Sequence, residues 1–398
     1  MIISLDGIKL SVGARKAFSY ILHNQPVTRA QVCSFMGIGA SSISKYISEL
    51  IDRKLIDEYG VQKSTGGRKP LLYKVSTNNF FILCINISTI YCEVAISDFS
   101  LNLLKLEHFH ISSKDNPDDI VNRIVQCYRE FKKELNLSDF MFLGGGVTLF
   151  SELKDENGIM YEPIISSMNK EWLEYPFVKA LRNKIRIPIY AEKGITATAA
   201  LEYNFGSRKT DGSMLYILCA TSIRSAFMLN GKVQQNSPYY EDAFGHMVID
   251  FDGRQCQCGQ YGCLNCYSTI PVILEDFKTN IKLGKKTSFC GDLDNISIEE
   301  VCALAENNDE CASDVIRSAA RYLGIALANY VNVTNPGMVV MAGLIVELSD
   351  LYYETAIAGA QTHLDKTHNC YTEFRRLGSF EHPITTSCAS LVLESLFS

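Results

Sequence analysis

Apolar residues spaced three or four positions apart predict three short helices near the start of the chain, over residues 13–25, 29–37 and 41–54. Thr28 is a favourable N-cap for the second helix, and Gly37 is a favourable stop for it. The apolar stripes consist of Ala17, Ile21 and Leu22, then Val32 and Phe35, then Ile43, Ile47, Leu50 and Ile51. Because only a short turn separates the second and third segments, the pattern indicates a helix-turn-helix.

Alternating polar and apolar residues over 55–75 then predict two strands joined at Gly66-Gly67, which would form a wing beside the helices. In a helix-turn-helix the first residues of the last helix enter the major groove of DNA, and a basic wing tip contacts phosphates. The side chains that we expect to contact DNA are Arg29, Ser41, Ser42, Ser44, Lys45, Tyr46, Lys63, Arg68 and Lys69. The alternative is a three-helix interaction module whose basic residues are only solvated.

The charge distribution favours a polyanionic partner for this first segment alone. Residues 1–75 contain eleven Lys or Arg and five Asp or Glu, a net charge of +6, whereas the whole chain carries −6. The remaining residues therefore carry −12. A basic module on an acidic body is typical of a protein that binds nucleic acid through that module.

The 398 residues, 47% of them apolar, are enough for two or three globular domains. No signal peptide and no apolar run of membrane-spanning length is recognisable, so we expect a cytoplasmic protein without a membrane partner. Many of the 14 cysteines stand alone in apolar or helical stretches, for example Cys33, Cys84, Cys127, Cys219 and Cys302. Such cysteines are typical of buried thiols in a reducing compartment.

The body of the chain repeats one order of elements, in which strands are followed by helices and a further strand. The first copy comprises three strands within 80–111 with a turn near Asp98, a helix over 119–135 and a strand over 140–150. The second comprises a strand pair within 213–235 with a turn at Asn230-Gly231, helices such as 313–334 and a strand over 338–343. Two such lobes favour an α/β fold with a cleft between them.

Four potential metal ligands lie close together in the second copy: His246, Cys256, Cys258 and Cys263. Their pattern is G-H, nine residues, then C-x-C-G-x-x-G-C. Three thiolates and one imidazole suit tetrahedral Zn²⁺, and a set of four protein ligands leaves no position for water, so we expect a structural zinc ion. Cys266 is expected to lie outside the ligand set. The alternative is a reduced cysteine cluster without metal.

This cysteine pattern and the GGRKP segment at 66–70 resemble the zinc signature and the wing of regulators in the ROK family, which comprises repressors, open reading frames and sugar kinases. The resemblance covers essentially the whole chain. It implies a winged helix-turn-helix followed by a two-lobed domain of the actin and hexokinase type, with an RNase H-like α/β fold. The expected domains are 1–76, a first lobe over 77–200 completed by about 385–398, and a second lobe over 201–384.

The glycine-rich phosphate loops of the family's kinases are altered in this chain. Where the kinases have D-x-G-G-T, the chain reads Asn86-Ile87-Ser88-Thr89, so an amide replaces the carboxylate that would address the metal. The second loop, G-T-G-x-G in kinases, reads Ala220-Thr221-Ser222-Ile223-Arg224. Both changes argue against a nucleotide site.

The groups for proton transfer and sugar binding also differ. The resemblance puts Gly194 where the family's kinases have the catalytic aspartate, and Glu192 lies two positions away. Two glutamates that bind hexoses in the family are replaced by Ala243 and Asn265. Glu192, Asp242 and Asn265 remain candidates for an effector cleft.

We therefore expect a DNA-binding transcriptional regulator, a repressor of the ROK family, with a non-catalytic effector and dimerisation domain. Its expected partners are a double-stranded DNA operator, a sugar or sugar-derived effector, and further copies of the chain in a homodimer or homotetramer. The alternatives are a sugar kinase with an accessory N-terminal domain, and a ligand-independent assembly protein whose cleft is filled by side chains such as Phe244 and Arg224.

Overall fold

The computed structural model describes residues 10–61, 70–162, 168–206, 212–234, 243–364 and 371–395. The chain divides into two compact units. Unit 1 comprises residues 1–162, 166–205 and 380–398, and unit 2 comprises 163–165 and 206–379. No helix in the described ranges is long and apolar enough to cross a membrane.

Unit 1 begins with three helices and a small antiparallel sheet of order β1-β3-β2. The elements are α1 (Val12–Asn24), β1 (Val27–Thr28), α2 (Arg29–Met36), α3 (Ala40–Asp52), β2 (Ile56–Val61) and β3 (Leu71–Val75). The expected start and stop of the second helix are confirmed, since Thr28 and Gln31 form a capping box and Gly37 ends the helix at φ 65°. The described elements follow the order that is typical of a winged helix, and we refer to them by that name.

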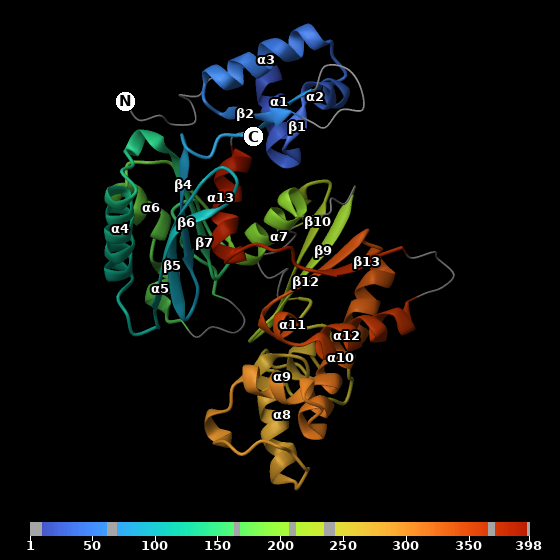
Figure 1. Cartoon of the computed structure of the whole chain (residues 1–398). Helices are drawn as coiled ribbons and strands as arrows, with labels where there is room; N and C mark the ends of the chain where they lie inside the picture. Colours follow the sequence, from blue (N-terminus) through green and yellow to red (C-terminus); the bar gives the residue numbers. More distant parts are fainter. Residues whose placement is uncertain are drawn as a thin grey trace. The chain divides into compact units, whose positions relative to one another are not determined.

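The rest of unit 1 is built on a five-stranded sheet of order β6-β5-β4-β7-β8. Its strands are β4 (Phe81–Ile87), β5 (Tyr91–Ser97), β6 (Leu103–His110), β7 (Phe142–Leu149) and β8 (Ile189–Lys193). Its helices are α4 (Pro117–Glu134), η2 (Asp139–Met141), α5 (Lys170–Glu174), α6 (Phe177–Lys184), α7 (Gly194–Phe205) and α13 (Pro383–Ser395). The C-terminal helix α13 packs on β4, β7 and α7 (Figure 1).

The winged helix and α13 share one hydrophobic core. Phe18 and Ile21 of α1 belong to the same buried cluster as Cys388, Val392 and Leu393 of α13. The ring of Phe18 also lies 6.1 Å from that of Phe99, at the turn after β5. Helix α1 is therefore packed against the first lobe as well as against α3.

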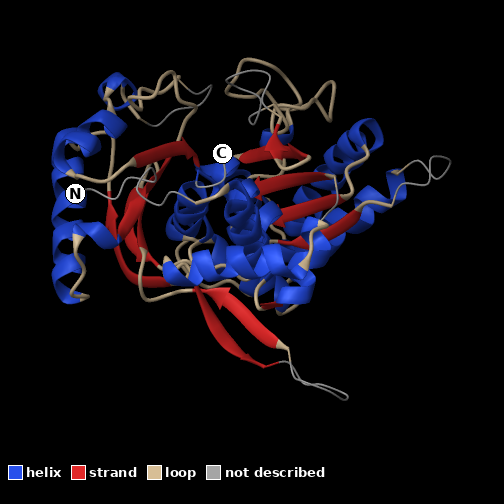
Figure 2. Ribbon diagram, turned by 90° about the horizontal axis from the view of Figure 1, so that it is seen from above, coloured by secondary structure: helices blue, strands red, loops and turns tan. Residues whose placement is uncertain are grey.

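Unit 2 carries a second five-stranded sheet of order β11-β10-β9-β12-β13. Its strands are β9 (Ser213–Cys219), β10 (Ile223–Leu229), β11 (Lys232–Val233), β12 (Met338–Ala342) and β13 (Glu373–Arg376). Its helices are η3 (Leu264–Cys266), α8 (Ile270–Lys282), η4 (Leu293–Asn295), α9 (Ile298–Glu306), α10 (Glu310–Thr334), α11 (Leu344–Leu348) and α12 (Asp350–His363). Figure 2 distinguishes the strands of both sheets from the helices that flank them.

The two sheets have the same topology, which confirms the expected duplication. In each, three successive strands are antiparallel, a fourth strand pairs in parallel with the first of them, and a fifth strand pairs in parallel with the fourth. The segment 213–235 differs in detail from the expected pair, because it forms three strands with one turn at 220–222 and another at Asn230-Gly231. The polar residues Thr221 and Ser222 interrupt the apolar pattern and permit the additional turn.

Candidate metal centre and DNA-binding surface

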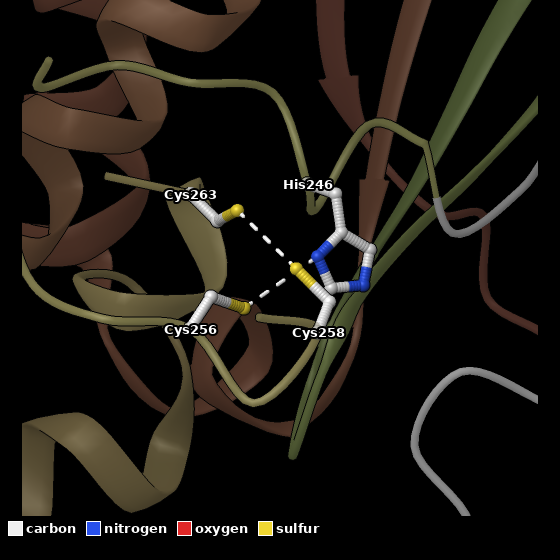
Figure 3. Close-up of side chains that lie close together, drawn as sticks. All are labelled: His246, Cys256, Cys258 and Cys263. Carbon is white, nitrogen blue, oxygen red and sulfur yellow. Dashed lines mark hydrogen bonds between the residues drawn. The ribbon is translucent and has the colours of Figure 1, made fainter. Parts of the chain in front are cut away.

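The four predicted ligands of the zinc motif lie together in unit 2. One ligand atom from each of His246, Cys256, Cys258 and Cys263 lies within 4.8 Å of the others, and this is the group of metal-ligating side chains found among the described residues (Figure 3). The Sγ atoms of Cys258 and Cys263 are 3.8 Å apart, and Cys256 Sγ lies 3.6 Å from Nδ1 of His246. Tetrahedral zinc requires separations of about 3.8 Å between sulfurs and about 3.5 Å between sulfur and nitrogen. The side chains therefore fit a zinc ion.

The loop brings these ligands together through tight turns and short antiparallel bridges. Val248 pairs with Cys263, and Gln255 pairs with Tyr261. Gly262 has a φ of 72°, and a Cβ atom there would lie 1.7 Å from the carbonyl oxygen of Asp250. Only glycine fits this position, which explains the glycine directly before the last ligand.

Electrostatics in the loop favour a cation. Burial, together with the nearby thiols of Cys258 and Cys256, raises the pKa of Cys263 to about 12. Burial likewise raises the pKa of Cys266, in η3, to about 12. Several thiolates this close together repel one another, so a divalent cation is needed to hold three of them deprotonated.

The predicted DNA-contacting residues of α3 do not all face the same way. Ser41, Ser42 and Lys45 are exposed. The Ser44 hydroxyl donates a hydrogen bond to the carbonyl of Ala40 at 2.7 Å. The sequence pattern did not distinguish the three exposed side chains from Ser44, because all four residues lie near the start of the helix.

Tyr46 faces α1 and is half-buried. A Cβ atom at Gly13 would lie 2.0 Å from its ring, so the absence of a side chain at Gly13 lets the tyrosine pack there. Glu49 of the same helix accepts hydrogen bonds from the backbone and hydroxyl of Ser11 at 2.9 and 2.7 Å. Tyr46 and Glu49 thus hold α3 on the first turn of α1.

The exposed face of α3 extends to Ser48, which our sequence interpretation missed. Its spacing of three residues from Lys45 is the signal that could have found it. Arg29 is exposed at the start of α2 and donates to the hydroxyl of Tyr73 at 3.3 Å. The predicted wing-tip residues Lys63, Arg68 and Lys69 lie outside the described residues.

The turn between β4 and β5 carries the altered phosphate loop. The Ser88 side-chain oxygen accepts hydrogen bonds from the backbone N–H groups of Ile90 and Tyr91 at 3.2 and 3.0 Å. The buried amide of Asn86 accepts from the Thr148 hydroxyl at 3.1 Å and donates to the Tyr91 hydroxyl at 3.5 Å. The polar groups of this turn are therefore paired with one another.

The remaining candidates for an effector site lie in different units. In unit 1, burial raises the pKa of Glu192 to about 6, and neighbouring Glu152 adds to the effect. In unit 2, the amide oxygen of Asn265 accepts a hydrogen bond from the backbone N–H of Ile223 at 2.9 Å, which ties the metal loop to β10. Asp242 lies outside the described residues.

The structure also places Gly194, the second altered loop and Phe244, which were named from the sequence. Gly194 is the first residue of α7, directly after β8. In the second altered loop, the backbone N–H of Ala220 donates to the carbonyl of Ser222 at 3.3 Å, and Arg224 is half-buried on β10. Phe244 is buried in the core of unit 2, with its ring 5.6 Å from that of Tyr330.

Comparison with known proteins identifies similar sequences and folds. The chain is 24% identical over 327 residues to the xylose repressor of Bacillus spizizenii, covering 82% of this chain and 80% of that protein. It is 25% identical to the DNA-binding transcriptional dual regulator NagC of Escherichia coli K12, and the match covers 81% of this chain and 78% of that protein.

Two solved structures are similar in fold. One is a ROK family transcriptional regulator, a homologue of the E. coli MLC protein, with a TM-score of 0.79, 23% identity and coverage of 97% and 96%. The other is a ROK family glucokinase from Streptomyces griseus, with a TM-score of 0.66, 16% identity and coverage of 79% and 99%. The model of the ROK family matches residues 82–379. The chain therefore belongs to the ROK family.

Proposed function

We propose that the protein is a DNA-binding transcriptional regulator of the ROK family that acts as a repressor. The observation that carries this proposal is the exposed face of α3, where Ser41, Ser42, Lys45 and Ser48 lie on a helix otherwise packed into the winged helix. Short polar side chains and one cation on such a helix can approach base edges and phosphates in the major groove. The positive charge of the first 75 residues supports the same partner.

The relatives named as repressors support the direction of regulation. The xylose repressor of Bacillus spizizenii shares 24% identity with this chain. The N-acetylglucosamine repressor of E. coli O6:H1 shares 25% identity with it. By analogy we propose a sugar or sugar-derived effector and action in the cytoplasm. We further propose a homodimer or homotetramer, because one helix-turn-helix contacts only half of a two-fold symmetric site.

We propose one structural Zn²⁺ held by His246, Cys256, Cys258 and Cys263. The ion supplies the positive charge that keeps the three thiolates together, and it fixes the fold of the loop. Asn265 follows two residues after the last ligand and ties the loop to β10 through Ile223. Metal binding would therefore stabilise unit 2 beyond the loop itself.

The kinase-like body is proposed to be non-catalytic. Phosphate loops bind nucleotides through backbone N–H groups, and the Ser88 side chain already accepts hydrogen bonds from two of these, on Ile90 and Tyr91. Asn86 offers an amide in place of a metal-binding carboxylate. Gly194 has no side chain that could accept a proton.

One observation favours a sugar kinase as the second candidate function. Glu192 has its pKa raised to about 6, which suits a general base acting near neutral pH. Measuring ATP turnover distinguishes the two candidate functions, because a kinase turns over ATP when its sugar is added and the regulator does not.

DNA binding by the full-length protein tests the proposal. We expect affinity for a duplex to fall steeply as salt concentration rises, because each neutralised phosphate releases counterions. Lys45→Ala should mostly reduce discrimination between sequences, whereas Ser44→Ala, whose hydroxyl faces the helix backbone, should not. Absence of binding at low salt would contradict the proposed function.

A further inference from the structure

Strand β6 forms one edge of the first five-stranded sheet. Among the strands of the described ranges it pairs with β5 alone. It is eight residues long, and one of its side chains, that of Phe109, is buried. An edge strand offers backbone N–H and C=O groups to a further strand, and proteins usually block such edges with charged side chains or bulges. The side chains of β6 therefore decide which strand can be added to it.

The backbone of β6 alternates between β5 and the open edge. The N–H of Ile111 donates to the carbonyl of Ile90, the residue before β5, at 3.0 Å. Because successive residues of a strand direct their backbone groups to opposite sides, Lys105 and Glu107 also pair with β5. Leu106 then directs its N–H and C=O to the open edge. A bulge at Leu104 ends this regular ladder, so the regular part of the edge covers 105–110.

Two opposite charges lie on one face of this regular edge. Lys105 Nζ lies 2.7 Å from Oε2 of Glu134 on α4. Glu107 Oε1 lies 3.4 Å from a guanidinium nitrogen of Arg123, also on α4. Each of these four side chains is between 42% and 54% exposed. Lys105 and Glu107 therefore remain accessible to a further charged partner.

The order of these charges fits a second copy of β6 that runs antiparallel to the first. In such a pair, side chains directly opposite each other interact, and like charges destabilise the pairing. A two-fold axis at Lys105 or at Glu107 would bring two like charges together. An axis at His108 would put Glu107 opposite Phe109 and form no charge pair. An axis at Leu106 puts Lys105 of each copy opposite Glu107 of the other.

We propose that β6 is a dimerisation edge, at which two copies of the chain pair antiparallel about a two-fold axis at Leu106. The proposal gives a surface to the homo-oligomer of the proposed function and rests on it. The two Leu106 residues exchange backbone hydrogen bonds. On the α4 side, Glu134 and Lys105 of one copy continue into Glu107 and Arg123 of the other, as a row of alternating charge. Since both copies use the same edge, the pairing closes at two strands.

Two charge reversals test the proposal. Lys105→Glu puts two acidic side chains opposite each other, and Glu107→Lys puts two basic side chains opposite each other. Sedimentation of each full-length protein at graded concentrations should show this association weakened about tenfold. In an equimolar mixture of the two variants, every facing pair again has opposite charges, so the association should recover. Because the mixture contains the same two chains, its recovery cannot come from a change in folding.

Lys179→Glu is the matched control for Lys105→Glu. Lys179 is exposed on α6, a helix that packs on β8 at the opposite edge of the sheet. The variant changes the net charge by the same amount, so it should associate as the wild type does.

Cross-linking tests the register. With the axis at Leu106, residue 105 of one copy and residue 107 of the other have Cα atoms about 4.5 Å apart, which a disulfide can bridge. Two copies of residue 105 would be about 8 Å apart, which is too far. Oxidising a mixture of Lys105→Cys and Glu107→Cys should therefore give a covalent dimer. Neither variant alone should cross-link more than the wild type, whose exposed Cys290 sets the background.

The outcomes separate this proposal from the proposed function. Wild-type-like association of both charge variants, or no gain of cross-linking in the cysteine mixture, would refute pairing through β6. A wild type that still associates would then leave the proposed homo-oligomer standing, with its interface elsewhere. A wild type that stays monomeric at every concentration would refute both. Recovery in the charge mixture together with cross-linking specific to the cysteine mixture would establish the β6 edge whether or not the protein binds DNA.

Discussion

The Ser88 side-chain oxygen accepts a hydrogen bond from the backbone N–H of Tyr91 at 3.0 Å and a second from Ile90 at 3.2 Å. In this turn a serine side chain therefore occupies backbone donors that a glycine-rich loop would offer to phosphate. The side chain that distinguishes the sequence from a kinase loop thus has a defined structural role in the turn.

We expect no phosphorylation of sugars by this protein. A kinase needs a base, a phosphate loop and an aligned hydroxyl together, and the loss of one such group costs orders of magnitude in rate. Ser88→Gly should also remain inactive, since Asn86 would still lack a carboxylate. The assay is ATP turnover with magnesium and a panel of hexoses, amino sugars and pentoses. Turnover stimulated by one sugar would contradict the account and identify Glu192 as the base, to be checked with Glu192→Gln.

The metal loop should contain about one zinc ion per chain. Cys258→Ser should reduce the zinc content to well below half an equivalent and lower the melting temperature, because metal binding contributes to folding free energy. Cys266→Ser is the control and should retain the metal. Metal analysis of protein purified without chelator decides this. Full zinc content in Cys258→Ser, or its loss in Cys266→Ser, would show that the ligand set is wrong.

Glu93 should make stability depend on pH. Burial disfavours its ionised form, but hydrogen bonds from Thr385, His108 and His382 outweigh burial and lower its pKa below 4.5. A carboxyl group with a lowered pKa stabilises the fold above its unfolded-state pKa, and this contribution is lost as the pH falls through the folded-state value.

The test compares wild type with Glu93→Gln in urea unfolding. At neutral pH the variant should be less stable by about 1–3 kcal/mol, because buried donors lose a charged acceptor. The difference should shrink as the pH is lowered below about 4. Equal stability at neutral pH, or a difference that persists unchanged in acid, would disprove the role given to Glu93.

Close packing of α13 on β7 should make Gly146 intolerant of substitution. A Cβ atom there would lie 1.9 Å from the carbonyl oxygen of Cys388, and backbone cannot give way as a flexible side chain does. Gly146→Ala should lower the free energy of unfolding by about 1–3 kcal/mol. Gly359→Ala in α12 is the control, since its nearest contact would be an ordinary 3.5 Å. If both variants were as stable as wild type, α13 would not be packed on the first lobe as described.

Local sequence signals predicted those parts of the structure that depend on local chemistry. Thr28 and Gly37 bound α2 because capping needs only neighbouring residues. The zinc ligands were recognisable because a metal imposes ligand types and spacing, and the four side chains do lie together.

The orientation of α3 could not be predicted in the same way. Tyr46 lies over Gly13 and Ser44 bonds to its own helix, whereas Ser48 is exposed. Which face of a helix is covered depends on residues distant in sequence, and in this case on a glycine in α1. The raised pKa of Glu192 likewise depends on burial by other elements of the fold, which a single sequence motif does not reveal.

Selection of DNA from a random pool by the full-length protein tests the central claim most directly. We predict enrichment of one sequence with two-fold symmetry, bound at nanomolar to subnanomolar affinity at physiological salt, as is typical of specific regulators. Ser42→Ala should change which bases are preferred, with an expected loss of about 1–3 kcal/mol in discrimination, whereas Ser44→Ala should select the wild-type sequence. Enrichment of no sequence, or selection unaffected by Ser42→Ala and Lys45→Ala together, would contradict the assignment of α3 as the DNA-reading helix.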